Sequence, residues 1–245
     1  SIFFMIALTV FLISTYKKNT IKIIKDAGYP ALLGGLVMSL SFIAFVVSMS
    51  NTTVANVVFI ISTQTMFLAI FGYFYLKEKI SLISFFSILL AMGGIIIMVG
   101  DSLSTGSFFG NIVALAIPIN FSILVMVIRK NKNLDMVPAI FYSGIFSIIY
   151  GLILSESFAF TSHDILMGFF LGVPQLAFGF ICITIGSRTT PSATIGLLML
   201  TETLFAPIWV WLFLSEIPPY SVLIGGAIII LAIILKSLDK KKVVS

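Results

Sequence analysis

Glu202 is the one acidic residue that this sequence places deep inside an apolar stretch, between residues 192 and 214. Because a charged carboxylate in hydrocarbon costs about 2.5–3.5 kcal/mol, such a residue needs a partner, a polar cavity or a bound proton. Its side chain can therefore bind a cationic group or exchange a proton with its surroundings. The structural alternative is a protonated glutamic acid that hydrogen-bonds to Gln64, Thr201 or a backbone carbonyl.

Three amide side chains, Gln64, Asn120 and Gln175, occupy the middles of other apolar stretches. Each amide both donates and accepts hydrogen bonds, which suits the carboxylates, amides and amines of small metabolites. Hydrogen bonding between packed helices is the alternative for each of them. Trp209 lies one to two turns from Glu202, where its ring would stack on a ligand or pack against another helix. The candidate substrate-binding residues are Thr63, Gln64, Asn120, Gln175, Thr201, Glu202 and Trp209.

The residues that enzymes and metal sites need are scarce in this chain. Cys182 is the only cysteine and His163 the only histidine, so one chain can build neither a disulfide framework nor a cysteine–histidine metal cluster. Glu202 has no histidine, cysteine or aspartate at a similar depth, and the sequence contains neither an HExxH motif nor a GxxxxGK(S/T) loop. We therefore predict no catalytic residue, no metal, no cofactor and no enzymatic activity.

Apolar stretches of about the length of a bilayer span recur along the whole chain. Hydrophobic residues make up 60% of the sequence and charged residues 9%, against about 25% charged in soluble domains. A helix needs about 20 residues to cross the hydrocarbon core of a membrane. We therefore predict an all-α, polytopic membrane helical bundle surrounded by lipid, with spans near residues 2–16, 30–49, 54–75, 80–99, 109–128, 137–155, 165–186, 192–214 and 219–236.

The basic residues lie in short clusters between these spans. All fourteen Lys and Arg residues fall in alternate connections and in the carboxyl-terminal tail, and the intervening connections contain none. Since Lys and Arg concentrate on the cytoplasmic side, the pattern predicts a multi-pass inner-membrane protein with a cytoplasmic carboxyl terminus. These clusters account for the net charge of +5, and we predict no nucleic-acid partner.

The second half of the sequence repeats the first at an offset of 138 residues. The tripeptide Thr63-Gln64-Thr65 aligns with Thr201-Glu202-Thr203, and Glu78 aligns with Glu216. The connection after the first copy is basic, whereas the connection after the second contains no basic residue. The two copies are therefore predicted to point in opposite directions across the membrane.

An inverted repeat of this kind predicts two units of five helices each, at residues 1–100 and 101–245. Nine spans are visible, so we expect the first of ten helices to precede Ser1. Inverted repeats recur in secondary carriers, whose substrate sites lie near the middle of the membrane between the repeats.

The densest motif runs from Pro191 to Leu235 and combines a small residue after proline, two leucines, a mid-helix glutamate, an interfacial glutamate and a glycine-rich last helix. In this pattern the chain resembles the drug/metabolite transporter superfamily, EamA type, along its whole length. Met66 departs from the family, whose members often have proline at this point of the first copy. The resemblance implies ten helices and transport of small metabolites across a plasma membrane, without specifying the substrate.

The resemblance and the mid-span polar residues together predict a secondary active transporter. Its expected substrate is a small polar metabolite, such as an amino-acid-like solute, an amine or a related compound. Transport would proceed by alternating access through a central midplane site, coupled to protons through Glu202. The alternatives are a membrane channel and a non-transporting receptor or scaffold.

Prolines accompany two of the candidate site residues. Pro118 and Pro174 lie within two residues of Asn120 and Gln175. A proline inside a helix frees a backbone carbonyl, which would add a polar group to a site on a discontinuous helix, or it simply kinks the helix.

Two spans, 80–99 and 219–236, have no strongly polar residue at their middles and are expected to face lipid or another subunit. Their glycine pairs, Gly93-Gly94 and Gly225-Gly226, predict close packing between helices first and a homodimer interface second. The cavity is expected among the helices that carry polar residues, at 30–49, 54–75, 109–128, 165–186 and 192–214.

Overall fold

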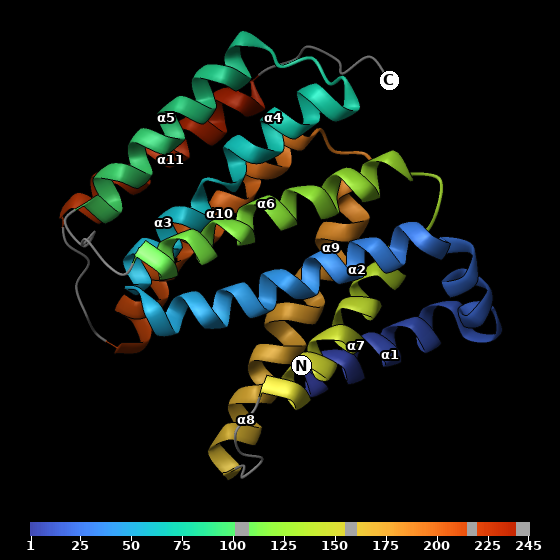
Figure 1. Cartoon of the computed structure of the whole chain (residues 1–245). Helices are drawn as coiled ribbons and strands as arrows, with labels where there is room; N and C mark the ends of the chain where they lie inside the picture. The colour runs from blue at the N-terminus through green and yellow to red at the C-terminus, as the bar shows by residue number, and fades with distance from the viewer. Residues whose placement is uncertain (101–107, 155–160, 215–219, 239–245) are drawn as a thin grey trace. The chain divides into compact units, whose positions relative to one another are not determined.

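The computed structural model of the chain describes residues 1–100, 108–154, 161–214 and 220–238 (Figure 1). Within these ranges all regular secondary structure is helical, and no strand is present. A helix pairs its backbone N–H and C=O groups internally, which a chain surrounded by lipid requires. The all-α prediction is confirmed for the described part of the chain.

Each of the nine predicted spans coincides with helix in the described ranges. The α-helices are joined by a 3₁₀ turn, η1, and a π-helical segment, η3. In chain order the elements are α1 (Ile2–Tyr16), η1 (Lys17–Asn19), α2 (Thr20–Asn51), α3 (Val54–Ser62), α4 (Gln64–Leu76), α5 (Leu82–Val99), α6 (Phe108–Lys130), α7 (Val137–Leu154), α8 (Ser162–Phe170), η3 (Leu171–Ala177), α9 (Phe178–Ser187), α10 (Ser192–Leu214) and α11 (Tyr220–Ser237).

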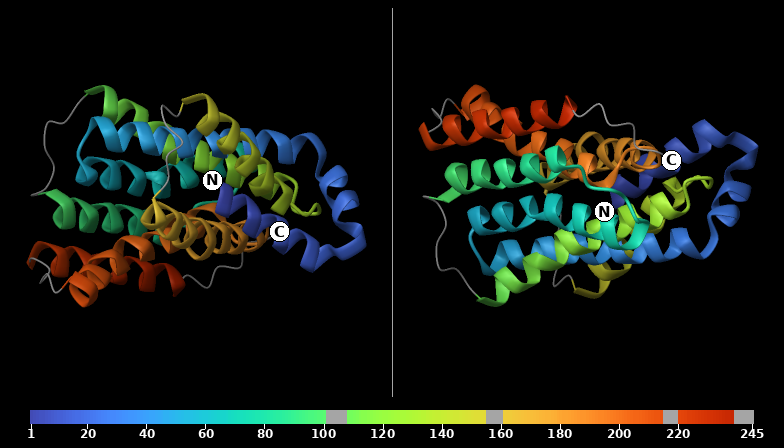
Figure 2. Two further views of the ribbon diagram at one scale, coloured as in Figure 1. Left: turned by 90° about the horizontal axis from the view of Figure 1, so that it is seen from below. Right: turned by 90° about the horizontal axis from the view of Figure 1, so that it is seen from above.

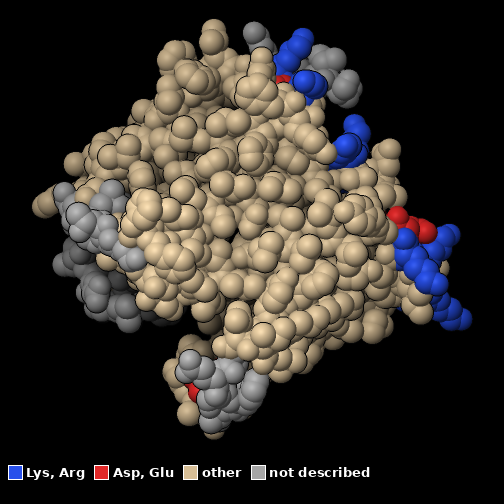
Figure 3. Space-filling model, in the orientation of Figure 1, with Lys and Arg blue, Asp and Glu red and all other residues tan. Residues whose placement is uncertain are grey.

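The lengths and compositions of these helices fit a multi-pass membrane protein. Among the described residues, six helical segments are long and apolar enough to cross a membrane, and two shorter apolar helices accompany them. The first of the six, Ile2–Asn51, contains two predicted spans, because the chain turns between them at Lys17 and at Gly28, each with a φ of 50°. On the face drawn in Figure 3, uncharged residues form nearly all of the surface.

Two of the predicted spans are interrupted near their middles. The span predicted at 54–75 consists of α3 and α4, separated at Thr63. The span predicted at 165–186 passes through the π-helical segment η3, which contains Pro174. The discontinuity expected beside Gln175 is therefore present, whereas α6 continues as an α-helix through Pro118.

The chain folds into two compact units, and each takes residues from both halves of the sequence. The first unit comprises residues 1–43 and 123–189, and the second comprises residues 44–122 and 190–245. The division of the sequence into repeats at 1–100 and 101–245 concerns internal similarity rather than compactness, and it stays a prediction.

In the first unit, glycines allow helices to pack closely. At Gly35 of α2, an added Cβ would lie 2.5 Å from Cβ of Tyr142 in α7, and at Gly172 of η3 it would lie 2.9 Å from Cβ of Phe3 in α1. Another face of α1 is buried and apolar, with Phe4, Leu8 and Leu12 almost fully covered. These contacts fix α1 against α7 and η3.

Polar side chains connect the helix ends of the first unit on the side that carries the basic residues. The Tyr16 hydroxyl donates to the Asp135 carboxylate. The Arg129 guanidinium donates to the carbonyl of Ser187 at 3.1 Å, and that of Arg188 donates to the carbonyl of Lys132, also at 3.1 Å. Two arginines therefore pair with backbone carbonyls where α6 and α9 end.

The second unit is built around two helix pairs, α5 with α11 and α4 with α10. Figures 1 and 2 show α5 and α11 lying side by side along their lengths. An added Cβ at Gly94 would lie 2.8 Å from the Gly225 carbonyl oxygen, and one at Gly225 would lie 2.5 Å from the Gly94 carbonyl oxygen. The predicted close packing is confirmed for these two glycines.

Both pairs in the second unit are antiparallel. In the first pair, Gly94 of α5 lies near Gly225 and Ile229 of α11. Met98, one turn further along α5, lies near Gly225, which is one turn earlier in α11 than Ile229. On α10 the contact likewise moves backwards, from Gly196 beside Thr65 to Ser192 beside Gly72. The antiparallel α5–α11 pair agrees with an inverted repeat, in which these helices hold equivalent positions. The superposition of the complete repeats stays a prediction.

Candidate functional site

The candidate site in the second unit is built at the interruption between α3 and α4. The N–H of Thr63 donates to the Ile60 carbonyl at 3.1 Å, three residues back, and the Thr63 hydroxyl donates to the same carbonyl. One residue earlier, the Ser62 hydroxyl donates to the Val58 carbonyl at 2.8 Å. Hydroxyl groups that compete for helix carbonyls bend helices, and two in succession contribute to the irregular turn at Thr63.

Gln64 is the first residue of α4 and is buried, with 6% of its surface exposed. Within the described part of the chain, its side-chain amide has no hydrogen-bond partner. Side chains of a helix tilt toward its amino-terminal end, so Gln64 projects toward the interruption. The Gln64 amide is not among the fully buried unpaired side-chain groups of the described chain, so it keeps access to a ligand or water, with which it can exchange hydrogen bonds.

The next residue along α4 fixes this helix against α10. The Thr65 hydroxyl donates to the Gly196 carbonyl at 3.0 Å, and Thr65 is fully buried. An added Cβ at Gly196 would lie 2.8 Å from Cα of Thr65, so the glycine permits the close crossing. Gln64 is therefore held one residue from the point where α4 crosses α10.

Glu202 lies on α10, six residues beyond this crossing, on a stripe of exposed side chains with Leu198 and Phe205. Its carboxylate and the Gln64 amide do not hydrogen-bond to each other. The neighbouring Thr201 hydroxyl donates to the Leu198 carbonyl at 2.7 Å within its own helix. Glu202 therefore forms a side-chain hydrogen bond with neither Gln64 nor Thr201, the two side-chain partners that the structural alternative proposes.

The remaining predicted site residues are divided between the two units. Asn120 lies half-buried on α6 in the second unit, and Gln175 lies exposed in η3 in the first unit. The side chain of Trp209 lies outside what the structure describes. The structure thus places Thr63, Gln64, Asn120, Thr201 and Glu202 in one compact unit, and the role of Gln175 stays a prediction.

Glu78 has a definite structural role that the sequence did not indicate. Its carboxylate accepts a hydrogen bond from the N–H of Ser192, the first residue of α10, at 2.9 Å. The one signal in the sequence is the alignment of Glu78 with Glu216, which lies outside the described residues. That alignment points to equivalent positions in the two copies and names no partner for either glutamate.

A second polar cluster, also missed from the sequence, joins the α2–α3 connection to the start of α6. The Thr52 hydroxyl donates to the side-chain oxygen of Asn111 at 2.7 Å, and the Asn56 amide donates to the same oxygen at 3.3 Å. Asn56 is 5% exposed. This cluster fixes two helix ends on the side without basic residues.

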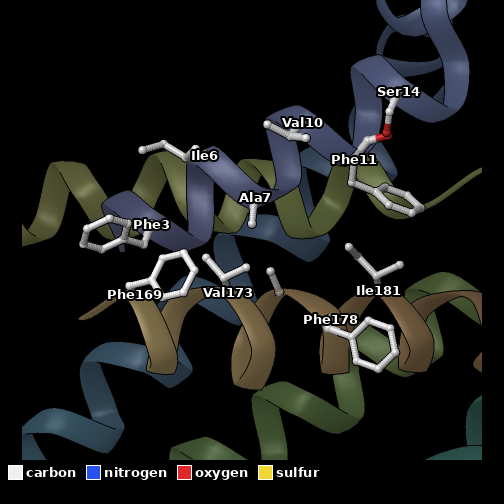
Figure 4. Close-up of a pocket in the computed structure, with 11 residues that line it drawn as sticks. Phe3, Ile6, Ala7, Val10, Phe11, Ser14, Phe169, Val173, Phe178 and Ile181 are labelled. Atoms are coloured by element: carbon white, nitrogen blue, oxygen red, sulfur yellow. The ribbon is translucent and has the colours of Figure 1, made fainter. Parts of the chain in front are cut away.

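The first unit contains an apolar groove of about 570 Å³ between α1 and the segment formed by η3 and α9 (Figure 4). Phe3 and Phe169 meet edge to face at one end, with their ring centroids 5.9 Å apart. Ser14 is the one polar residue in its lining. Since none of the seven predicted site residues lines it, this groove is distinct from the candidate site and suits apolar material.

Among the described residues, no group of three or more His, Cys, Asp or Glu side chains lies close enough to hold a metal ion. At the candidate site, Gln64 offers an amide, Thr63 and Thr201 offer hydroxyl groups, and Glu202 offers one carboxyl group.

Comparisons with known proteins agree with this architecture. The chain is 26% identical over 234 residues to an uncharacterized transporter of Clostridium kluyveri, covering 89% of this chain and 74% of that protein. A crystal structure of another protein has the same fold, with a TM-score of 0.81 at 16% identity, over 96% of this chain and 87% of the other. The family model of the EamA-like transporters matches residues 1–100 and 107–238. This multi-pass membrane protein therefore belongs to the EamA-like transporter family.

Proposed function

We propose that this chain is a secondary active transporter that moves a small polar metabolite across the bacterial inner membrane, with its carboxyl terminus in the cytoplasm. The substrate would be an amino-acid-like solute, an amine or a related compound. The observation that carries the proposal is the irregular turn at Thr63 within a membrane helix, directly beside Gln64, which is 6% exposed. Transporters commonly place substrate sites at such broken helices.

The chemistry of the site supports a polar substrate. The Gln64 amide offers a donor and an acceptor, and Glu202 offers a carboxyl group on the helix that α4 crosses. A substrate amine would pair with the Glu202 carboxylate, whereas a neutral substrate would leave that carboxyl group free to carry a proton. Both uses justify a carboxyl group in a membrane span, which is otherwise costly.

Alternating access would use the interruption as a hinge. At Thr63 the helical hydrogen-bond pattern is irregular while the backbone stays in the right-handed helical region, so the segment can bend there and change the angle of α4 to α10. The substrate at Gln64 would then face one side of the membrane at a time. The arrangement favours a carrier over a scaffold, which needs neither a hinge nor polar groups such as Gln64 and Glu202 within its membrane helices.

The test is counterflow by the purified full-length protein in proteoliposomes. Vesicles loaded with unlabelled amino acids, amines, nucleosides or organic acids are mixed with a trace of the same labelled solute, with and without an imposed pH gradient. Saturable counterflow of a solute from this set is the expected result. Non-saturating flux with electrical conductance would indicate a channel, and absence of flux for every solute would indicate a receptor or scaffold.

A further inference from the structure

The carboxyl-terminal end of α4 turns sharply and brings Glu78 back over its own helix. Lys77 adopts the left-handed conformation, with φ 59° and ψ 28°, and the N–H of Glu78 donates to the Gly72 carbonyl at 3.0 Å. This bond, from an N–H to a carbonyl six residues back, is typical of a Schellman helix end. Non-glycine residues adopt the left-handed conformation rarely, so the turn is specific to this position.

The turn places the Glu78 carboxylate at the amino-terminal end of α10. The N–H of Ser192 donates to Oε2 of Glu78 at 2.9 Å. The first N–H groups of a helix lack partners within it, and the helix dipole favours a negative charge at that end. Glu78 therefore gives α10 a charge-assisted cap that comes from the end of α4.

Gly72 makes this approach feasible. An added Cβ at Gly72 would lie 2.9 Å from Oε2 of Glu78 and 2.9 Å from Cβ of Ser192. Ser192 itself is fully buried, so the contact lies inside the second unit rather than on its surface. The end of α4, the carboxylate and the start of α10 thus form one close-packed joint.

This joint links the two helices that carry the candidate site. Helix α4 begins at Gln64 and ends at the joint, while α10 begins at the joint and carries Glu202. Between the joint and the site, the bond from Thr65 to Gly196 holds the same two helices together. Lys77 and Lys79 flank Glu78, so the joint lies on the side that the basic residues predict to be cytoplasmic.

We propose that Glu78 is a positioning residue of the cytoplasmic gate, which holds α4 against α10 while that side is closed. The proposal rests on the proposed function, because alternating access requires α4 and α10 to separate toward the cytoplasm. Opening breaks the bond from Ser192 to Glu78, while α4 pivots at Thr63. Charge-assisted hydrogen bonds such as this one are strong enough to bias two conformations and weak enough to break in each cycle.

The test measures how readily a thiol reagent reaches the space between α4 and α10 from the cytoplasmic side. Ala69 is suitable, because it is buried and packs in one cluster with Ala193 of α10. The gate reporter is Ala69→Cys in a Cys182→Ala background, since Cys182 is exposed and would react. Inside-out vesicles and a membrane-impermeant maleimide give the labelling rate, and no substrate is needed.

Glu78→Ala removes the cap, and we expect it to raise the labelling rate of the gate reporter at least about fivefold. Glu78→Gln keeps an acceptor oxygen and loses the charge, so its rate should fall between those of Glu78→Ala and the parent. Lys79→Gln changes a neighbouring exposed charge and should leave the rate unchanged.

A second reporter, Ala139→Cys in the same background, separates gate opening from loss of structure. Ala139 is fully buried in the first unit, so a thiol at this position should stay unreactive in every variant. An unchanged rate of the gate reporter in Glu78→Ala would overturn the proposal, as would a parallel rise at position 139. Because labelling and counterflow are independent measurements, failure of transport and failure of the gate are distinguishable.

Discussion

The two helix pairs of the second unit are held together by different chemistry. Helices α5 and α11 meet through glycine and aliphatic side chains, with Gly94, Gly225 and Ile229 at the contact. Helices α4 and α10 also approach closely at Gly72 and Gly196, but their contact includes hydrogen bonds as well, from Thr65 to the Gly196 carbonyl and from Ser192 to the Glu78 carboxylate. The first pair contains no mid-span polar residue, and the second carries Gln64 and Glu202.

This difference indicates which pair can move. Close packing of backbone against backbone is lost steeply when helices separate, because many short van der Waals contacts disappear together. A few hydrogen bonds can exchange with water or substrate, so the net cost of breaking them is small. We therefore interpret α5–α11 as the rigid scaffold of the second unit and α4–α10 as its adaptable pair.

The largest effect is expected from Gly225→Leu, which would break the scaffold. A Cβ at this position lies 2.5 Å from the Gly94 carbonyl oxygen and 2.7 Å from Cβ of Met98, so the helices must part. We expect the free energy of unfolding to fall by about 3 kcal/mol or more, which would appear as failure to fold or as a large drop in melting temperature. Gly93→Leu is the matched control, since nothing lies within 4 Å of its Cβ position. Equal melting temperatures for the two variants would refute the scaffold assignment.

The next effect concerns the adaptable pair and its chemistry. Glu202→Gln keeps the size of the side chain and removes its charge and its proton exchange. Because Glu202 is exposed and has no side-chain partner in the described chain, the melting temperature should change little. Transport should fall at least about tenfold, equivalent to about 1.4 kcal/mol. Uptake or counterflow across a range of pH tests this, and unchanged transport with an unchanged pH profile would remove Glu202 from the mechanism.

Much of the fold was predictable because the strongest physical constraint acts on composition. A chain in lipid must form helices of about membrane length, so the apolar stretches alone predicted where the described residues form helix. The glycine pairs indicated the close contact of α5 with α11 for a related reason, since only small residues allow backbones to approach so closely.

The interruption at Thr63 and the partner of Glu78 were not predictable in this way. Thr63 interrupts its helix because its hydroxyl and that of Ser62 turn back onto carbonyls, whereas Thr201 does the same in α10 without interrupting it. The outcome therefore depends on packing, which the sequence pattern does not contain. Glu78 finds Ser192 across 114 residues of chain, and the alignment of glutamates in the two copies did not identify that partner.

A smaller effect is expected from Gly72→Ala, which adds a methyl group at the joint between α4 and α10. The added methyl group would meet Oε2 of Glu78 and Cβ of Ser192 at 2.9 Å each. Because the carboxylate can shift, we expect the free energy of unfolding to fall by only about 1 kcal/mol, at the lower end of the range for overpacking. Gly179→Ala is the control, because its Cβ position has no neighbour within 4 Å. A loss as large as that of Gly225→Leu would show that both pairs are equally rigid.

The smallest effect is expected from Thr65→Val, which removes the hydroxyl that bonds to Gly196 and keeps the shape of the side chain. Hydrogen bonds between membrane helices contribute about 0.6 kcal/mol on average, because the separated helices find other partners. Thr9→Val is the matched control, since the Thr9 hydroxyl donates to the Met5 carbonyl within its own helix. Thermal unfolding of both variants in the same detergent gives the difference. A loss of unfolding free energy several kcal/mol larger for Thr65→Val than for Thr9→Val would show that the crossing of α4 and α10 is a fixed contact. Helix α4 could then not pivot at Thr63 relative to α10.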